Sequence, residues 1–177
     1  KQLIIFDIYE NNAYDIQMEL VRKYPYLNLE VLIGYVRNTA RLDRVLSKYK
    51  PDIVFHAAAH KHVPLMEDSP NEAIKNNVFG TYKMAQAAVK YGVKKIVFSS
   101  TCAIFGEPGY TPLDENHKKN PVNPYGEPQL EIEKYLAAYD EKYGIKSICL
   151  RYFNVAGADS GTRIGEWHEP ETHLIPN

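Results

Sequence analysis

A strand end rich in hydroxyl groups and a tyrosine further along the chain form the most informative chemical pattern in this sequence. The run FSSTCAIFG places Ser99, Ser100 and Thr101 at the end of an apolar stretch, and Tyr125 follows a segment rich in Pro and Gly. Hydroxyl groups that face a tyrosine at a helix start suit proton transfer at a substrate alcohol. A second interpretation stays open, in which Tyr125 packs at a helix start and the hydroxyl groups cap the following loop.

Tyr125 needs a neighbouring charge to act as a base, because the reference pKa of a tyrosine is about 10. A lysine one helical turn later would supply that charge, but this sequence has Gln129 there. A glutamine can donate a hydrogen bond and carries no charge. Pro128 removes a backbone donor from the same helix and is expected to bend the turn that presents Tyr125.

A second candidate site is the segment HAAAHKH at residues 56–62, which follows another apolar run. Its small alanines let a ligand approach the backbone closely, as a dinucleotide would require, and Lys61 could meet a phosphate or a hydroxyl group. The histidines invite a metal-site interpretation, but no carboxylate or cysteine completes a ligand set. The same holds for Trp167, His168 and His173, so no metal site is predicted.

Asp7 ends the first apolar run of the chain. An acid at a strand end can accept hydrogen bonds from both hydroxyl groups of an adenosine ribose, and it disfavours a 2′-phosphate. The same residue could instead cap the helix that follows. Position alone leaves both interpretations open.

Alternating strand and helix patterns would position these residues. Apolar runs predict strands at 2–7, 29–34, 52–59, 94–100 and 146–153, and helical spacing predicts helices at 13–24, 39–49, 71–90 and 124–143. This alternation predicts an α/β fold with a Rossmann-like, doubly wound parallel sheet. Ligands bind such sheets at the carboxyl ends of the strands, where the candidate residues fall.

Composition narrows the class of protein. The 177 residues are 45% hydrophobic and 24% charged, which fits one soluble globular domain. With 21 basic and 22 acidic residues, the chain predicts neither a nucleic-acid partner nor a membrane partner. The absence of a signal-peptide pattern predicts a cytoplasmic protein. Cys102 and Cys149 stand in apolar contexts, which favours buried thiols over a disulfide.

Four longer motifs carry a family resemblance: VKKIVFSSTCAIFGEP, NPVNPYGEPQLEIEKYL, LRYFNVAGAD and GEWHEPETHLIPN. With them, the sequence resembles an extended short-chain dehydrogenase/reductase of the NAD-dependent nucleotide-sugar epimerase/dehydratase family. The C-terminal half resembles UDP-glucose 4-epimerase. The N-terminal half, with PDIVFHAAAHKHVPLMEDSPNEAIKNNVFGT, resembles the 4,6-dehydratases of capsular polysaccharide biosynthesis. The resemblance implies interconversion of UDP-glucose and UDP-galactose by transient oxidation at C4 with NAD.

The resemblance also implies a role for each matching residue. The implied catalytic residues are Thr101, Tyr125 and, at the lysine position, Gln129. The implied cofactor-binding residues are Asp7, Tyr35, Val36, Ala57, Ala58, Ala59, Lys61, Asn77, Ser99, Tyr125 and Tyr152. The implied UDP-sugar contacts are Lys61, Thr101, Phe153, Asn154, His173 and Leu174. The family has an acid where this chain has Tyr35, so this ring is expected to stack on the adenine or fill its slot.

The family's glycine-rich strand-turn-helix would precede Lys1, so the resemblance implies a sheet without its first strand and glycine-rich loop. Residues 1–155 would then be a partial NAD-binding domain, and residues 156–177 the start of an incomplete substrate-binding region. The sheet edges left open predict a homo-oligomer. One alternative is a non-catalytic remnant, a pseudoenzyme or an engineered fragment or chimera. Another is a 4,6-dehydratase, although Cys102 and Ala103 occupy the positions of the dehydratase acid and base.

Overall fold

The computed structural model describes residues 1–57, 68–154 and 161. The strands are β1 (Gln2–Asp7), β2 (Asn28–Ile33), β3 (Ile53–His56), β4 (Lys95–Thr101) and β5 (Lys146–Tyr152). The helices are α1 (Glu10–Lys23), α2 (Thr39–Tyr49), α4 (Pro70–Ala73), the π-helix η1 (Ile74–Phe79), α5 (Gly80–Lys90), the 3-10 helix η2 (Cys102–Ile104) and α6 (Gly126–Tyr143). The predicted α/β class is therefore confirmed, with element bounds shifted by a few residues.

All strand pairs are parallel, and they form two sheets. Strand β1 pairs with β2, and a second sheet has the order β3-β4-β5, with Thr101 opposite Tyr152 at its carboxyl edge. Within the described residues no strand joins β1 to β3, so the parallel strands fall into two groups. Each sheet therefore presents its carboxyl ends at a single edge.

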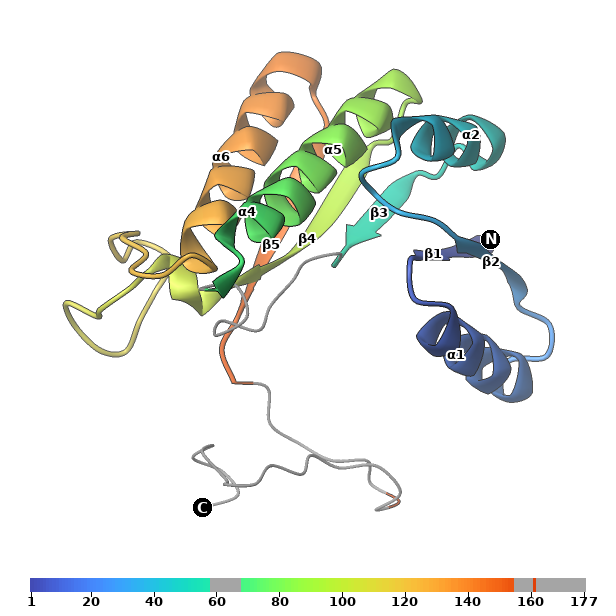
Figure 1. Cartoon of the computed structure of the whole chain (residues 1–177), viewed down its shortest axis with the longest axis horizontal. Helices are drawn as coiled ribbons and strands as arrows, with labels where there is room; N and C mark the ends of the chain where they lie inside the picture. Colours follow the sequence, from blue (N-terminus) through green and yellow to red (C-terminus); the bar gives the residue numbers. More distant parts are fainter. Residues whose placement is uncertain (58–67, 155–160, 162–177) are drawn as a thin grey trace.

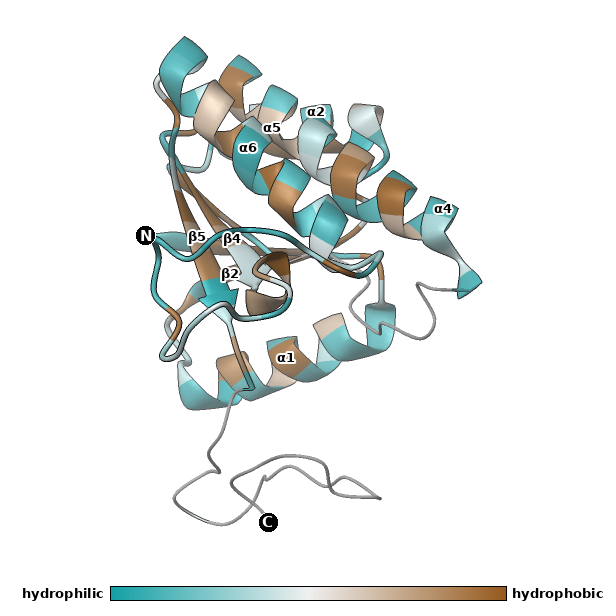
Figure 2. Ribbon diagram, turned by 90° about the vertical axis from the view of Figure 1, so that its left-hand side faces the viewer, coloured by the Kyte–Doolittle hydropathy of each residue, from teal (hydrophilic) through white to brown (hydrophobic). Residues whose placement is uncertain are grey.

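Helices lie on both sides of the strands, as a doubly wound fold requires (Figures 1 and 2). Helices α2, α5 and α6 form one layer, and α1 lies on the opposite side. The main core fills the space between α5, α6 and the three-stranded sheet. Its buried members are Ala85, Ala88, Val93, Ile96, Phe98, Ile132, Leu136 and Ile145. None of the helices in the described ranges is long and apolar enough to cross a bilayer.

The three-stranded sheet buries only one of its faces. Ile96 and Phe98 point into the core, whereas residues of the other face, such as Phe55, Ile148 and Leu150, are exposed. The apolar strand patterns predicted cover on both faces, as in parallel sheets generally. Phe55 is 76% exposed, so no described element covers this face of the sheet.

A second core joins the two sheets through α2 and α5. Leu42 and Leu46 of α2 pack with Met84 and Ala87 of α5, and Phe6 of β1 packs against this cluster. Apolar residues at helical spacing on α2 therefore connect the two-stranded sheet to the rest of the molecule.

Candidate active site

The predicted hydroxyl pair is brought together at the carboxyl edge of β4. Thr101 is the last residue of β4 and is 8% exposed, and Tyr125 is the residue that immediately precedes α6. The Thr101 side chain lies beside the Tyr125 phenol, whose pKa it lowers. Thr101 Oγ1 also accepts a hydrogen bond from the backbone N–H of Ala103 at 3.2 Å. Thr101 thus caps the following turn and also lies next to Tyr125.

The start of α6 is fixed by Asn123 and by a glycine. Asn123 Oδ1 accepts hydrogen bonds from the backbone N–H groups of Tyr125 and Gly126, at 3.1 and 2.7 Å. A Cβ atom on Gly126 would lie 2.5 Å from the carbonyl oxygen of Ala103. Only glycine therefore lets the helix start approach η2 closely enough to bring Tyr125 to Thr101.

Burial raises the pKa of Tyr125 above its ordinary value of 10.0, and the Thr101 side chain lowers it by a smaller amount. The phenol is consequently neutral at pH 7, where it can donate a proton. Acceptance of a proton from a substrate alcohol requires the phenolate, which is scarce at this pH.

Gln129 is fully buried one helical turn after Tyr125. Within the described part of the chain, its Nε2 and Oε1 atoms have no hydrogen-bond partner. A buried amide without partners costs free energy unless another group satisfies it. Gln129 is therefore a polar group of the interior whose hydrogen-bonding capacity is unused.

Pro128 stands in the first turn of α6. Helix α6 begins at Gly126 and continues unbroken to Tyr143, so Pro128 is its third residue. The first backbone N–H groups of a helix have no partner within the helix, and a proline in the first turn therefore loses nothing.

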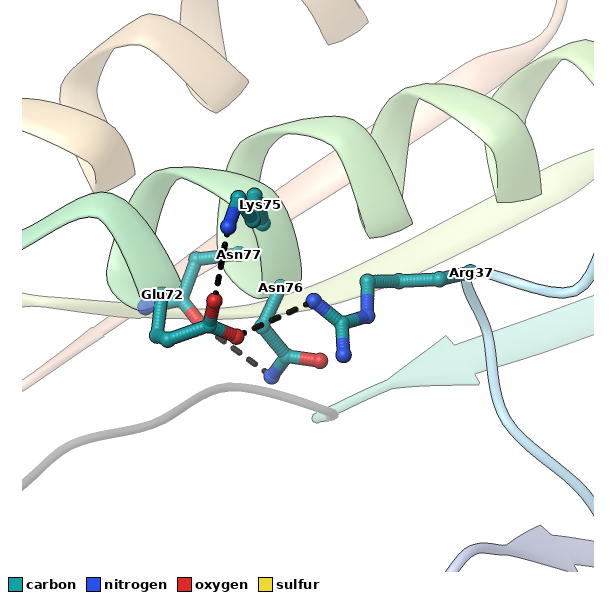
Figure 3. Close-up of polar contacts among 5 residues, drawn as sticks. All are labelled: Arg37, Glu72, Lys75, Asn76 and Asn77. Carbon is teal, nitrogen blue, oxygen red and sulfur yellow. Dashed lines mark hydrogen bonds and ion pairs between the residues drawn. The ribbon is translucent and has the colours of Figure 1, made fainter.

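Two asparagines line the interior next to α6. The predicted helix 71–90 contains the π-helix η1, which packs against α6 and carries Asn76 and Asn77, 6% and 0% exposed. Asn76 Nδ2 donates to Asn77 Oδ1 at 3.4 Å (Figure 3), and Asn76 Oδ1 has no partner among the described residues. π-Helices are rare and often mark functional sites. Asn77 was expected from the sequence, whereas Asn76 was missed, although the NN pair within an apolar helix pattern was a signal.

His56 is buried, and its contacts with other side chains are part of the protein interior. It ends β3, is 3% exposed, and its Nε2 lies 2.7 Å from Thr81 Oγ1. Its ring stacks on Phe98, with the ring centroids 6.0 Å apart. Burial lowers the pKa of His56 to about 4, so the imidazole is neutral at pH 7. No cluster of His, Cys, Asp and Glu able to hold a metal ion occurs in residues 1–57 and 68–154.

Asp7 is exposed at the carboxyl end of β1, where its Oδ1 accepts a hydrogen bond from the backbone N–H of Tyr9 at 2.7 Å. This contact forms a turn just before α1, whose N-cap residue is Tyr9, and no side chain caps the helix among the described residues. The carboxylate of Asp7 still has a second oxygen, and its exposure leaves that oxygen accessible to a ligand.

Tyr35 and Val36 lie on the loop after β2. Val36 is 7% exposed and belongs to the core cluster of α2 and α5. The Arg37 guanidinium lies over the Tyr35 ring, 4.2 Å from its centroid, and pairs with Glu72 at 3.2 Å. Glu72 also pairs with Lys75 (Figure 3). Arg37 thus covers one face of the Tyr35 ring and ties this loop to α4.

The remaining predicted residues lie at the same strand ends or outside the described residues. Ala57 follows β3, Ser99 lies in β4, and Tyr152, Phe153 and Asn154 are exposed at the end of β5. The predicted residues outside the described residues are Ala58, Ala59, Lys61, His173 and Leu174.

Comparison with known proteins identifies the family of this chain. Residues 1–169 match the model of a family described as polysaccharide biosynthesis protein. The chain is 44% identical over 173 residues to a UDP-glucose 4-epimerase of Rhizobium leguminosarum bv. trifolii, an alignment that covers 98% of this chain and 50% of the relative. The chain thus spans about half the length of the curated relatives it matches.

Solved structures agree with this assignment. A UDP-glucose 4-epimerase from Brucella ovis in complex with NAD is 31% identical with a TM-score of 0.78, covering 99% of this chain and 59% of that one. A UDP-glucose-4-epimerase from Stenotrophomonas maltophila with bound NAD and formylated UDP-arabinopyranose is 26% identical with a TM-score of 0.85, covering 99% and 52%. The chain therefore belongs to the polysaccharide biosynthesis protein family and is a member of the NAD-dependent epimerase/dehydratase group of short-chain dehydrogenases/reductases.

Proposed function

We propose that this protein acts as a nucleotide-sugar 4-epimerase that interconverts UDP-glucose and UDP-galactose with NAD. The observation that carries the proposal is the pair of hydroxyl groups on Thr101 and Tyr125 at the carboxyl edge of a parallel sheet. This edge is where such sheets bind ligands. The epimerase names of the relatives support the same chemistry.

The residues present fit a dinucleotide cofactor. The buried amide of Gln129 lacks partners among the described residues, and a ribose hydroxyl group could both donate to it and accept from it. Asp7 has an exposed carboxylate at the end of β1, which suits a ribose diol. In our proposal Asp7, Tyr35 and Val36 hold the adenosine side, and Asn77, Ser99 and Tyr152 flank the nicotinamide side.

The proposed reaction uses Thr101 and Tyr125 on the sugar 4-hydroxyl group. NAD, when bound, supplies the acceptor for the hydride that leaves C4. Thr101 orients the hydroxyl oxygen, and Tyr125 as phenolate takes the hydroxyl proton. After the keto-sugar has rotated to present its opposite face, C4 would regain a hydride there and Tyr125 would return the proton to the 4-oxygen. Phe153, Asn154, Lys61, His173 and Leu174 are the proposed sugar-nucleotide contacts, with residues 156–177 as the start of the substrate-binding region.

A second candidate function is nucleotide binding without turnover. The raised pKa of Tyr125 and the neutral Gln129 beside it favour this alternative, because they leave the phenol protonated at pH 7. The Tyr125 phenol would then serve only as a hydrogen-bond donor to the bound ligand.

Calorimetric titration with NAD, followed by UDP-glucose, separates these functions. We expect NAD to bind with a dissociation constant of about 1 to 100 μM, and UDP-galactose to form slowly in the same sample. Binding without product would favour the second candidate, and no binding at millimolar NAD would contradict both. Tyr125→Phe is the matched control, because it keeps the ring and removes the proton-transferring group. It should bind NAD and form no product.

The open face of the three-stranded sheet leads us to propose a homo-oligomer. Phe55, Ile148 and Leu150 expose apolar surface on one sheet face, and the outer edges of β1 and β3 are unpaired within the described residues. Such surfaces favour association. Sedimentation velocity should show a species larger than one chain at micromolar concentration. Phe55→Glu, which places a charge on this face, should shift the distribution toward the monomer. A monomeric profile for the unmodified protein would contradict the proposal.

We also place the protein in the cytoplasm. Cys102 and Cys149 are both free thiols, as is usual in a reducing compartment. Burial raises the pKa of Cys149 to about 11, so its thiol stays protonated and unreactive.

A further inference from the structure

A buried carboxylate joins three elements beside the hydroxyl pair. Glu133 of α6 is 8% exposed, and its Oε1 and Oε2 accept hydrogen bonds from Arg151 Nε and Nη2 at 3.0 and 2.8 Å. Glu133 Oε1 also accepts from Ser100 Oγ at 2.7 Å. Two parallel contacts from a guanidinium fix orientation as well as distance. Glu133 therefore holds α6, β4 and β5 in one arrangement.

The positions of these residues connect the ion pair to the chemistry. Ser100 directly precedes Thr101 in β4, and Arg151 lies opposite Ser100 in the parallel register. Tyr125, Gln129 and Glu133 follow one another at intervals of about one turn along α6, so they lie on the same side of the helix. The ion pair thus sets the height of α6 over β4, which decides where the Tyr125 phenol stands relative to Thr101.

Arg151 also anchors the loop that leads from Thr101 back to Tyr125. The guanidinium lies over the ring of Phe105, 5.5 Å from its centroid. Phe105 in turn meets the edge of His117, whose Nε2 accepts from the backbone N–H of Gly109 at 2.9 Å. His117 Nδ1 lies 3.0 Å from the carbonyl oxygen of Lys118. The loop is therefore folded around His117 and attached to Arg151.

A buried ion pair of this kind is weak evidence for stability. The cost of removing two charges from water often cancels their attraction, so apolar replacements can be equally stable. What such replacements lose is the directional constraint. We propose that the Glu133–Arg151 pair is a positioning device that sets the Tyr125 phenol against Thr101 for the proton transfer. This inference rests on the proposed epimerase function.

A double substitution separates positioning from folding. Glu133→Leu combined with Arg151→Met removes both charges and keeps apolar volume. The single variant Glu133→Gln keeps the shape and removes one charge, so it serves if the double variant does not fold. The matched control is Glu131→Ala with Lys134→Ala, which removes an exposed ion pair of the same helix. All are compared with the unmodified protein in the presence of NAD and UDP-glucose.

The first readout follows Tyr125 itself and needs no turnover. With ¹³C-labelled tyrosine rings, assigned by Tyr125→Phe, the Tyr125 signal of the double variant should move to the position found in Thr101→Val. In the control variant it should stay unchanged. An unshifted Tyr125 signal in a folded double variant would overturn the proposal, even if the protein proved to have no epimerase activity.

The second readout is kinetic. We expect kcat to fall about 10- to 100-fold in the double variant, because a displacement of about 1 Å has this effect on proton transfer. KM for UDP-glucose and the thermal unfolding midpoint should change little. Equal losses in kcat and in stability, restored together by lower temperature, would indicate a purely structural pair and overturn the proposal. Activity absent from the unmodified protein would contradict the proposed function alone.

Discussion

Gln129→Lys is expected to raise the rate of the proposed UDP-glucose conversion about 10- to 100-fold at pH 7. A positive charge close to an ionisable group shifts its pKa by about 1 to 3 units toward the charged form. An amine introduced one helical turn from Tyr125 would therefore offset the burial that raises the pKa of this phenol. Initial rates between pH 6 and 10 should show the largest gain at neutral pH. The unmodified protein should instead become faster as pH rises.

Gln129→Met is the matched control for this variant. It has nearly the same volume and no polar atoms, so it should leave the neutral-pH rate no faster than that of the unmodified protein. It should also raise the free energy of unfolding by about 1 to 3 kcal/mol, because it removes buried polar atoms that lack partners. If both variants accelerated turnover equally, the gain could not come from charge. An unchanged rate in Gln129→Lys would contradict the role given to this position.

Acidification should destabilise the fold through His56. The pKa of this histidine is lowered by burial from 6.5 to about 4, so the unfolded chain binds the proton more readily than the folded one. The resulting stability is complete above pH 6.5 and is lost as pH falls through this range toward 4. The loss amounts to about 3 kcal/mol. Urea unfolding at intervals between pH 7 and 4 measures it.

The comparison that isolates this histidine is His56→Gln. The glutamine amide can still pair with Thr81, at the place of the imidazole Nε2, and it does not titrate in this range. The difference in unfolding free energy between the two proteins should therefore shrink as pH falls toward 4. Parallel curves for the two proteins would mean that His56 is not the group that titrates.

The sequence pattern was sufficient to predict the helices and strands. It also predicted that the candidate residues meet at the carboxyl edge of the sheet. Apolar runs such as KIVFSS specify a strand through side-chain burial alone, and the parallel arrangement follows from strands that alternate with helices. The division into two sheets could not be predicted, because it depends on which strands are neighbours. The hydrophobic pattern within a strand does not specify its neighbours. The π-helix was also missed, because its asparagines sit within a pattern that fits an ordinary helix.

For the candidate site, the sequence identified the types and positions of the residues, but not the side chains that surround them. Thr101 and Tyr125 could be paired because each stands at an element end. The contacts of Glu133 could not be predicted, because a glutamate within an amphipathic helix is normally solvent-exposed. Its partners, Ser100 and Arg151, also lie far from it in the sequence, on two different strands. His56 was considered only as a metal ligand, since its burial depends on Thr81 and Phe98, which lie far along the chain.

The two sheets share no backbone hydrogen bonds among the described residues. The packing of α2 on α5 and the Arg37–Glu72 ion pair hold them together. Side-chain contacts can loosen without unravelling either ladder, so the junction between the two sheets depends on side chains alone. Asp7 ends the two-stranded sheet, whereas Thr101 and the Glu133–Arg151 pair belong to the side of the three-stranded sheet. Tyr35 lies at the junction, packed against the core cluster of α2 and α5. A dinucleotide bound as proposed, between Asp7 and Tyr152, would bridge this junction and stabilise it by mass action.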